Sequence, residues 1–191
     1  ERDKGPNTGG MGAYSPAPIV NKILEKKIIN KIVEPTLSEL RRKGNPYTGF
    51  LYVGLMIKNN EPYLIEFNVR MGDPECQVIL PRLNTDLLGL INNAVRNKFD
   101  QVKIKWKREK SMTIVLCSKG YPSKYKKNKI IKKLNKIKLK RNFFIFHAGT
   151  KIKDNNILSS GGRVLNVTGI GEKFSELRSD IVKIIKEINW K

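Results

Sequence analysis

The sequence predicts an α+β fold, on three observations. Apolar residues recur at helical spacing from Ile19 onward. Two continuous apolar runs, Phe50–Ile57 and Tyr63–Phe67, are joined by the turn-forming residues KNNEP and predict an antiparallel hairpin. The final stretch, Glu172–Ile188, carries apolar residues on one helical face.

The first half of the chain is expected to begin with a loop over residues 1–18, which hold four glycines and three prolines. A helix follows from Ile19; we expect Pro35 to interrupt it and one or two further turns to end at Gly44. Because both hairpin runs are apolar on both faces, we expect the hairpin to be covered on both sides. A helix over Leu87–Val95 should begin at an N-cap, Asp86 or Thr85.

A charged, weakly patterned stretch over residues 97–110 predicts a boundary. Beyond it the pattern predicts a small α+β unit with a C-terminal helix. Its expected strands are Met112–Cys117, Phe143–Phe146, a hairpin within Lys151–Leu158, and Arg163–Thr168 after the turn Ser160-Gly161-Gly162.

The formal net charge of +21 raises a nucleic-acid-binding module as one hypothesis, centred on the basic residues of 119–141. However, Lys, Ile and Asn together make 68 of the 191 residues, a bias that reaches apolar and neutral positions as well as basic ones. Lys outnumbers Arg by 28 to 10, whereas bidentate phosphate and base contacts favour Arg. We therefore favour a solvated, lysine-rich surface and do not expect a nucleic-acid partner.

The cysteines and the lengths of the apolar runs indicate the cellular compartment. Cys76 and Cys117 lie far apart and form no metal or disulfide pattern, which is typical of a reducing compartment. No apolar run approaches the roughly 18 residues that cross a bilayer. We expect a cytoplasmic protein without a membrane partner.

A metal site is one interpretation of EFNVR, residues 66–70. In a strand, Glu66 and Asn68 share a face with Leu64, and Arg70 joins them if the backbone stays extended. A carboxylate and an amide oxygen suit Mg²⁺, and the arginine would face phosphate groups. The same residues also fit a solvated strand end, with Asn68 stabilising a turn. In the following turn, Asp73-Pro74 would direct Glu75 back toward the site.

A second candidate is the glycine-rich stretch GPNTGGMGAYSP, residues 5–16. Such a loop can present successive backbone N–H groups to an anion. It matches neither the Walker A nor the GxGxxG pattern, and a flexible loop is the other interpretation.

The glycine-rich stretch and five later stretches resemble, in order, the phosphoribosylamine–glycine ligase (glycinamide ribonucleotide synthetase) family of the ATP-grasp superfamily. The later stretches are YTGFLYVGLMI, EFNVRMGDPECQVILPRL, SKGYP, FHAGT and SSGGRVLNVT. The resemblance implies the C-terminal part of an ATP-grasp domain over 1–105 and a small C-terminal domain over 106–191. It also implies that the chain lacks an N-terminal domain and an ATP lid, and that alone it is inactive. Another ATP-grasp carboxylate–amine ligase of purine metabolism is the alternative, and the glycine-rich loop argues against it.

By the resemblance, ATP would phosphorylate glycine and 5-phosphoribosylamine would then displace phosphate, giving glycinamide ribonucleotide in purine biosynthesis. Glu66 and Asn68 would be the ligands of Mg²⁺ or Mn²⁺, and Arg70 would face the transferring phosphoryl group. A further acidic ligand would be sought near Gly54, where the sequence has none, so we expect two protein ligands. The complete protein is expected to be a monomer. The expected substrate-binding residues are Gly9, Gly10, Met11, Gly12, Asp73 and Glu75.

Overall fold

The computed structural model describes residues 5–190, and these form two compact units. The hairpin unit comprises residues 17–72 and 83–106, and the sheet unit comprises residues 5–16, 73–82 and 107–190. The chain therefore passes between the units more than once, and the glycine-rich stretch folds with the last eighty residues.

The hairpin unit begins with one long helical stretch made of α1 (Lys22–Ile28), a π-helical turn (Ile29–Val33) and α2 (Glu34–Arg42). The prediction that Pro35 interrupts this helix was wrong. The π turn accommodates the proline, because Glu34 donates to Ile29 O, five residues back, and the carbonyl of Ile32 accepts from Thr36 Oγ1 at 2.7 Å.

The predicted end of this helix at Gly44 is confirmed. Gly44 adopts a positive φ of 77°. Its N–H donates to Arg41 O, and the next N–H, from Asn45, donates to Leu40 O at 2.9 Å. These two bonds define a Schellman motif, which needs a residue in the left-handed region and so favours glycine.

The predicted hairpin is formed by β2 (Tyr52–Lys58) and β3 (Glu61–Asn68). Asn59 and Asn60 both have positive φ, as a two-residue turn of type I′ requires. Within the described residues the hairpin is not covered on both faces as expected, since several of its apolar side chains are exposed: Met56, Tyr63, Leu64 and Ile65. The helix α4 (Leu87–Val95) completes the unit, with the predicted N-cap Asp86 accepting from Gly89 N at 2.6 Å.

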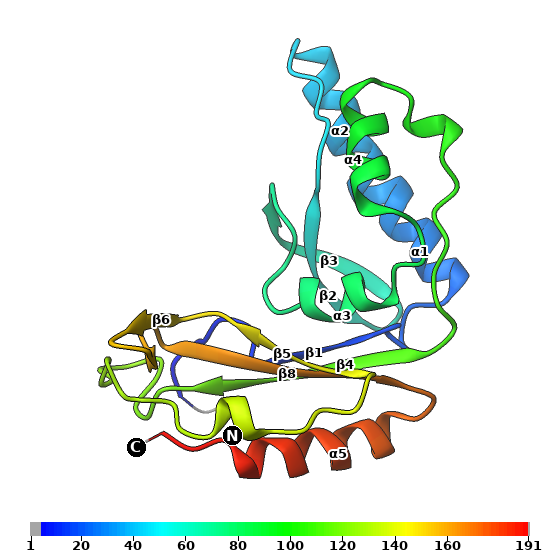
Figure 1. Ribbon diagram of the computed structural model, residues 1–191. Coiled ribbons are helices and arrows are strands. Elements are labelled where there is room, and N and C mark those ends of the chain that lie inside the picture. Colours follow the sequence, from blue (N-terminus) through cyan, green and yellow to red (C-terminus); the bar gives the residue numbers. More distant parts are fainter. Residues whose placement is uncertain (1–4, 191) are drawn as a thin grey trace. The chain divides into compact units, whose positions relative to one another are not determined.

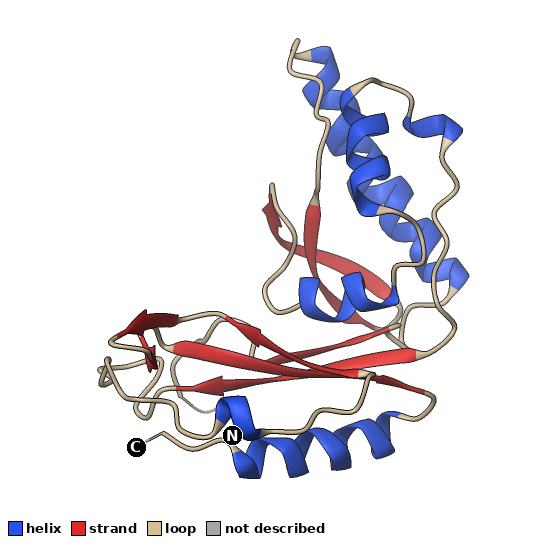
Figure 2. Cartoon of the chain, viewed as in Figure 1, coloured by secondary structure: helices blue, strands red, loops and turns tan. Residues whose placement is uncertain are grey.

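The sheet unit is built on a four-stranded antiparallel sheet in the order β1-β4-β8-β5. Figure 1 shows α5 on one face of this sheet and the short α3 on the other, and Figure 2 shows the same elements by type. A two-stranded hairpin, β6–β7, turns at Asp154-Asn155, both with positive φ. The bounds are β1 Gly12–Ser15, α3 Cys76–Ile79, β4 Lys110–Cys117, β5 Phe143–His147, β6 Thr150–Lys153, β7 Asn156–Ser159, β8 Arg163–Gly171 and α5 Phe174–Glu187.

The core of the sheet unit lies between the sheet and α5. Leu165 and Val167 of β8 pack with Leu177 and Ile181 of α5, and all four are almost fully buried. These α5 positions belong to the apolar face that the sequence predicted. The loop predicted over residues 1–18 was only partly correct, because β1 forms within it and pairs with β4.

Candidate active-site elements

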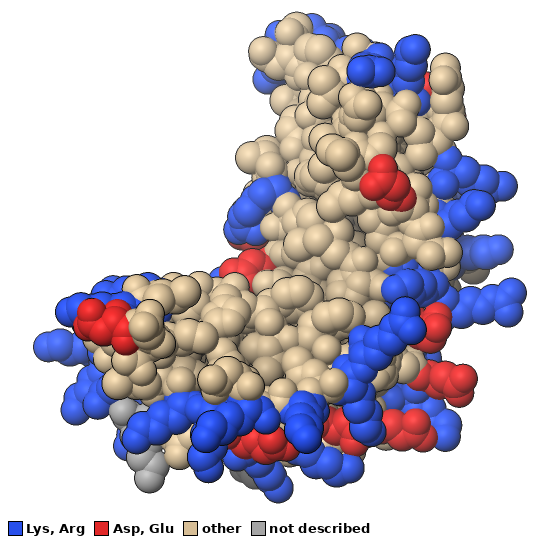
Figure 3. Space-filling model, viewed as in Figure 1, with Lys and Arg blue, Asp and Glu red and all other residues tan. Residues whose placement is uncertain are grey.

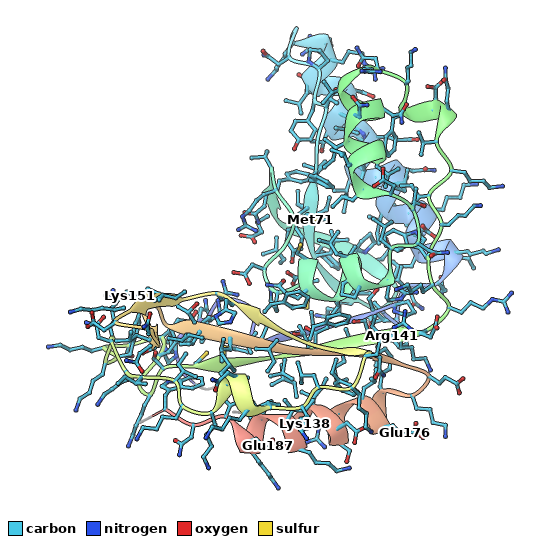
Figure 4. The ribbon with its side chains drawn as sticks, in the orientation of Figure 1. Met71, Lys138, Arg141, Lys151, Glu176 and Glu187 are labelled. Atoms are coloured by element: carbon cyan, nitrogen blue, oxygen red, sulfur yellow. The ribbon has the colours of Figure 1, made fainter. Side chains whose placement is uncertain are left out.

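Three polar side chains follow one another at the end of β3. Asn68 Nδ2 donates to Glu66 Oε1 at 2.8 Å, and Arg70 Nη2 donates to Asn68 Oδ1 at 3.1 Å. The strand ends at Asn68, yet Arg70 turns back toward it because its Nη1 also donates to the carbonyl of Met71 at 2.9 Å. Figure 4 labels Met71 on the loop that leaves β3. The carboxylate, amide and guanidinium of the hypothesis are therefore neighbours.

A β-bulge separates this group from the rest of β3. Glu66 pairs with Gly54 and Leu64 pairs with Leu55, so Ile65 is the extra residue. Because Gly54 and Leu55 point to opposite faces, their partners do too, and the prediction that Leu64 shares a face with Glu66 was wrong. Glu66 and Asn68 do share a face, since they pair with Gly54 and Tyr52.

The residues of this group fit a divalent cation in donor chemistry. Glu66 is exposed, and its carboxylate accepts one hydrogen bond from Asn68, which leaves acceptor capacity. Asn68 Oδ1 accepts from Arg70 and has a second lone pair. Over residues 5–190, no group of three or more His, Cys, Asp or Glu side chains is placed to hold a metal. A cation here would rely on one carboxylate, one amide and other oxygen donors.

The glycine-rich stretch lies in the sheet unit. The N–H of Gly9 donates to Tyr121 Oη at 3.0 Å, the carbonyl of Met11 accepts from Val115 N at 3.0 Å, and Gly12 begins β1 opposite Ile114. The N–H of Gly9 thus already donates a hydrogen bond within the protein. Gly9 is therefore not one of the free N–H groups that the anion-binding hypothesis requires.

Asp73 and Glu75 also belong to the sheet unit. Asp73 forms an ion pair with Arg163, at 2.8 Å between Oδ2 and Nη2. Glu75 directly precedes α3, and its carbonyl accepts from Val78 N at 3.1 Å and Ile79 N at 3.0 Å. The structure therefore assigns Asp73 a protein partner and places Glu75 at the start of a helix beside the sheet.

Arg163 is a residue of this region that sequence reasoning missed. It begins β8 directly after Gly161 and Gly162 and makes its polar contacts with segments about 90 and 153 residues away. The one signal in the sequence was its place after a glycine pair, where backbone and side chains can approach closely. The stretch itself predicts a turn into a strand, in which Gly161-Gly162 could let the backbone approach a ligand, but it predicts no role for the Arg163 side chain.

The basic residues form no single patch on the face drawn in Figure 3, where Lys and Arg are spread over both units with Asp and Glu among them. A surface depression of about 960 Å³ does lie beside the basic loop, lined by Lys119, Lys124, Lys126 and Lys129 with Ile185 and Trp190. Of the aromatics in residues 119–141, Tyr121 bonds to Gly9 and packs near Tyr125, with ring centroids 6.1 Å apart. No helix described between residues 5 and 190 is long and apolar enough to span a membrane.

Two family models match the chain. Phosphoribosylglycinamide synthetase, ATP-grasp (A) domain, matches residues 1–76, and Phosphoribosylglycinamide synthetase, C domain, matches residues 111–191. The matches place the chain among the ATP-grasp proteins, in agreement with its α+β fold. The chain belongs to the phosphoribosylglycinamide synthetase family.

Curated relatives carry a consistent description. The phosphoribosylamine–glycine ligase of Brucella melitensis is 44% identical over 98% of this chain, and that of Vibrio parahaemolyticus is 44% identical over the whole chain. The chloroplastic phosphoribosylamine–glycine ligase of Arabidopsis thaliana is 42% identical over 98% of this chain. The chain spans 44% of the length of each of the two bacterial relatives and 36% of the plant one.

Solved structures agree. The crystal structure of phosphoribosylamine–glycine ligase from Thermotoga maritima matches 99% of this chain with a TM-score of 0.80 at 34% identity, and the match covers 46% of that chain. An L-amino acid ligase from Bacillus licheniformis matches 98% of this chain and 45% of that chain with a TM-score of 0.67 at 16% identity. At that identity the second match shows a common fold only.

Proposed function

We propose that the complete protein carrying this chain is an ATP-dependent carboxylate–amine ligase that joins glycine to 5-phosphoribosylamine. The observation that carries the proposal is the 44% identity, over the whole chain, to a phosphoribosylamine–glycine ligase. Because the chain spans less than half of such relatives, the activity belongs to the complete protein. We further propose the division at 105/106 as its domain boundary, a cytoplasmic location and a monomeric state.

In the proposed reaction, a glycine carboxylate oxygen attacks the γ-phosphorus of ATP, giving glycyl phosphate and ADP. The amine of phosphoribosylamine then attacks the acyl carbon, phosphate leaves with the C–O electron pair, and the amine loses a proton. The products are glycinamide ribonucleotide, ADP and phosphate. No enzyme nucleophile is needed, so the protein contributes positioning and charge stabilisation.

The β3 end supplies the charged part of that contribution. Glu66 and Asn68 would hold Mg²⁺ or Mn²⁺, and the bound cation would neutralise phosphate charge. Arg70, held beside Asn68 by its bonds to Oδ1 and to the Met71 carbonyl, would donate to the transferring phosphoryl group. Substrate binding is proposed to depend on Gly9, Gly10, Met11, Gly12, Asp73 and Glu75.

The test follows ADP release by the complete protein with Mg²⁺, glycine and freshly generated phosphoribosylamine. Glu66→Gln keeps the side-chain size but removes the negative charge, and we expect the rate to fall by about a hundredfold. The matched control is Glu25→Gln, on the exposed side of α1, which should leave the rate unchanged.

ADP release that needs both substrates and is lost in Glu66→Gln supports the ligase and the metal role together. Full turnover in Glu66→Gln would show that Glu66 is not a required ligand. Absence of turnover in folded wild-type protein would overturn the ligase proposal. Tight binding of nucleic acid that weakens steeply between low and moderate salt would then favour the basic module.

A further inference from the structure

Arg163 joins three segments of the sheet unit through one guanidinium group. Its Nη1 donates to the carbonyl of Asp73 at 2.7 Å and to the carbonyl of Gly10 at 3.1 Å, while Nη2 donates to the Asp73 carboxylate at 2.8 Å. The glycine-rich stretch and the turn after β3 are thereby fixed to the start of β8.

Arginine is well suited to this set of contacts. Its planar fork presents donors in fixed directions, whereas lysine carries one compact charge on a flexible stem. The Arg163 side chain is 22% exposed, about half the 45% of Asp73, so the bonds form where water competes only partly. Charge-assisted bonds of this kind are stronger than neutral ones.

The glycine-rich stretch is shaped to receive this arginine. A Cβ added at Gly9 would lie 2.9 Å from Arg163 Cζ, and one added at Gly10 would lie 2.5 Å from Pro74 Cδ. Neither distance is compatible with a side chain unless the neighbours move. The close fit means that the position of Gly9 and Gly10 depends on where Arg163 and the 73–74 turn lie.

A second support comes from Tyr121. Its hydroxyl accepts from Gly9 N, and its ring lies so close to Gly162 that a Cβ there would be 2.2 Å from the ring carbon Cδ2. Gly162 directly precedes Arg163. The turn that contains Gly162 therefore positions both groups that hold the glycine-rich stretch. It contacts the ring of Tyr121, and it leads directly into Arg163.

We propose that Arg163 is a positioning residue that pre-forms the substrate-binding stretch Gly9–Gly12, and that Asp73 acts by holding Arg163 rather than by contacting substrate. The proposal rests on the proposed ligase function for its kinetic consequence, but the clamp itself is independent of which reaction is catalysed. Holding a loop in its binding conformation improves affinity because less ordering is needed when substrate binds.

The experiment uses the complete protein and three variants: Arg163→Lys, Asp73→Asn and the double variant. Arg178→Lys, exposed on α5, is the matched control. The first readout is hydrogen exchange of the peptide containing Gly9–Gly12. We expect each single variant to speed exchange by about tenfold, and the double variant to add little, because both changes disturb the same guanidinium–carboxylate contact.

The second readout is kinetic. We expect the KM for glycine or for phosphoribosylamine to rise about tenfold in both single variants, with kcat changed less than about threefold and the KM for ATP unchanged. Thermal melting identifies any variant that fails to fold; Arg163→Lys keeps the charge and the stem, so it is the primary variant.

Unchanged exchange in Arg163→Lys, in a folded protein, would overturn the clamp. Two outcomes would show that Asp73 contacts substrate directly, and either would overturn its assigned role. One is that the effects of the two single variants on KM add in the double variant. The other is a raised KM in Asp73→Asn while hydrogen exchange of Gly9–Gly12 stays at the wild-type rate. If the wild-type protein does not ligate at all, the proposed function fails, and the exchange readout still tests the clamp separately.

Discussion

Gly54 lies directly opposite Glu66 in the β2–β3 ladder, and a Cβ added at Gly54 would be 3.0 Å from Glu66 Cγ. The absence of a side chain on β2 therefore leaves the space in which the Glu66 carboxylate lies. A side chain at this position of β2 would therefore meet the Glu66 side chain.

Gly54→Ala is expected to displace the Glu66 side chain while the fold is kept, because Glu66 is exposed and can shift. If Glu66 is a metal ligand, the Mg²⁺ concentration for half-maximal ADP release should rise by about tenfold or more. Met56→Ala, at an exposed position of the same strand, is the control. An unchanged Mg²⁺ dependence in Gly54→Ala would argue against a metal role for Glu66.

Gly10→Ala is expected to displace the glycine-rich stretch, because its Cβ would meet Pro74 Cδ at 2.5 Å and the Asp73 carbonyl at 3.2 Å. A ring and a backbone carbonyl cannot move aside as a flexible side chain can. A misplacement of about 1 Å costs about a hundredfold in rate, which steady-state ADP release would measure. Thr8→Ala, at an exposed position two residues earlier, should keep the wild-type rate; equal losses in both variants would contradict the steric explanation.

Glu61 should make the stability of the hairpin unit depend on acid pH. Ion pairs with Lys27 and Lys31 lower the pKa of the Glu61 carboxyl from 4.5 to about 2. Because the pKa of Glu61 is lower in the folded protein, its negative charge stabilises the folded state at pH values above the unfolded pKa. That contribution is lost as the pH falls from about 4.5 to about 2. The urea midpoint of Glu61→Gln should therefore lie below wild type at pH 7 and approach it near pH 2. A constant difference across this range would show that the ion pairs do not contribute.

Ile181→Ala should destabilise the sheet unit by roughly 2–5 kcal/mol, because Ile181 is fully buried between α5 and the sheet. Urea denaturation followed by circular dichroism would measure the loss. Ser179→Ala, on the exposed side of α5, should change stability by less than about 0.5 kcal/mol. A loss below about 1 kcal/mol for Ile181→Ala would mean that the core is not organised around α5.

Local signals in the sequence predicted much of this fold. Two consecutive asparagines with positive φ form the β2–β3 turn, Asp86 begins α4, and Gly44 ends α2. Each of these depends on the conformational preference of one or two residues and on neighbours within a few positions. The sequence also predicted that Glu66 and Asn68 share a face, since that follows from the period of a strand.

The features that were missed depend on distant segments or on irregular backbone. The strand β1 forms because β4, about a hundred residues later, offers it a pairing edge. The bulge at Ile65 changes which side chains share a face, and the π turn before Pro35 keeps a helix where a proline predicts a break. Arg163 makes contacts across 153 residues, for which no local pattern exists.

The pairing of β1 with β4 has a consequence for the order of events during synthesis. At about 5–20 residues per second, Ile114 of β4 leaves the ribosome roughly 5 to 20 seconds after Gly12, its partner in the ladder. Throughout that interval the nascent segment Gly12–Ser15 has no strand beside it. Its length of four residues limits the hydrogen bonds it could offer to another chain, which lowers the risk of association before the sheet is complete.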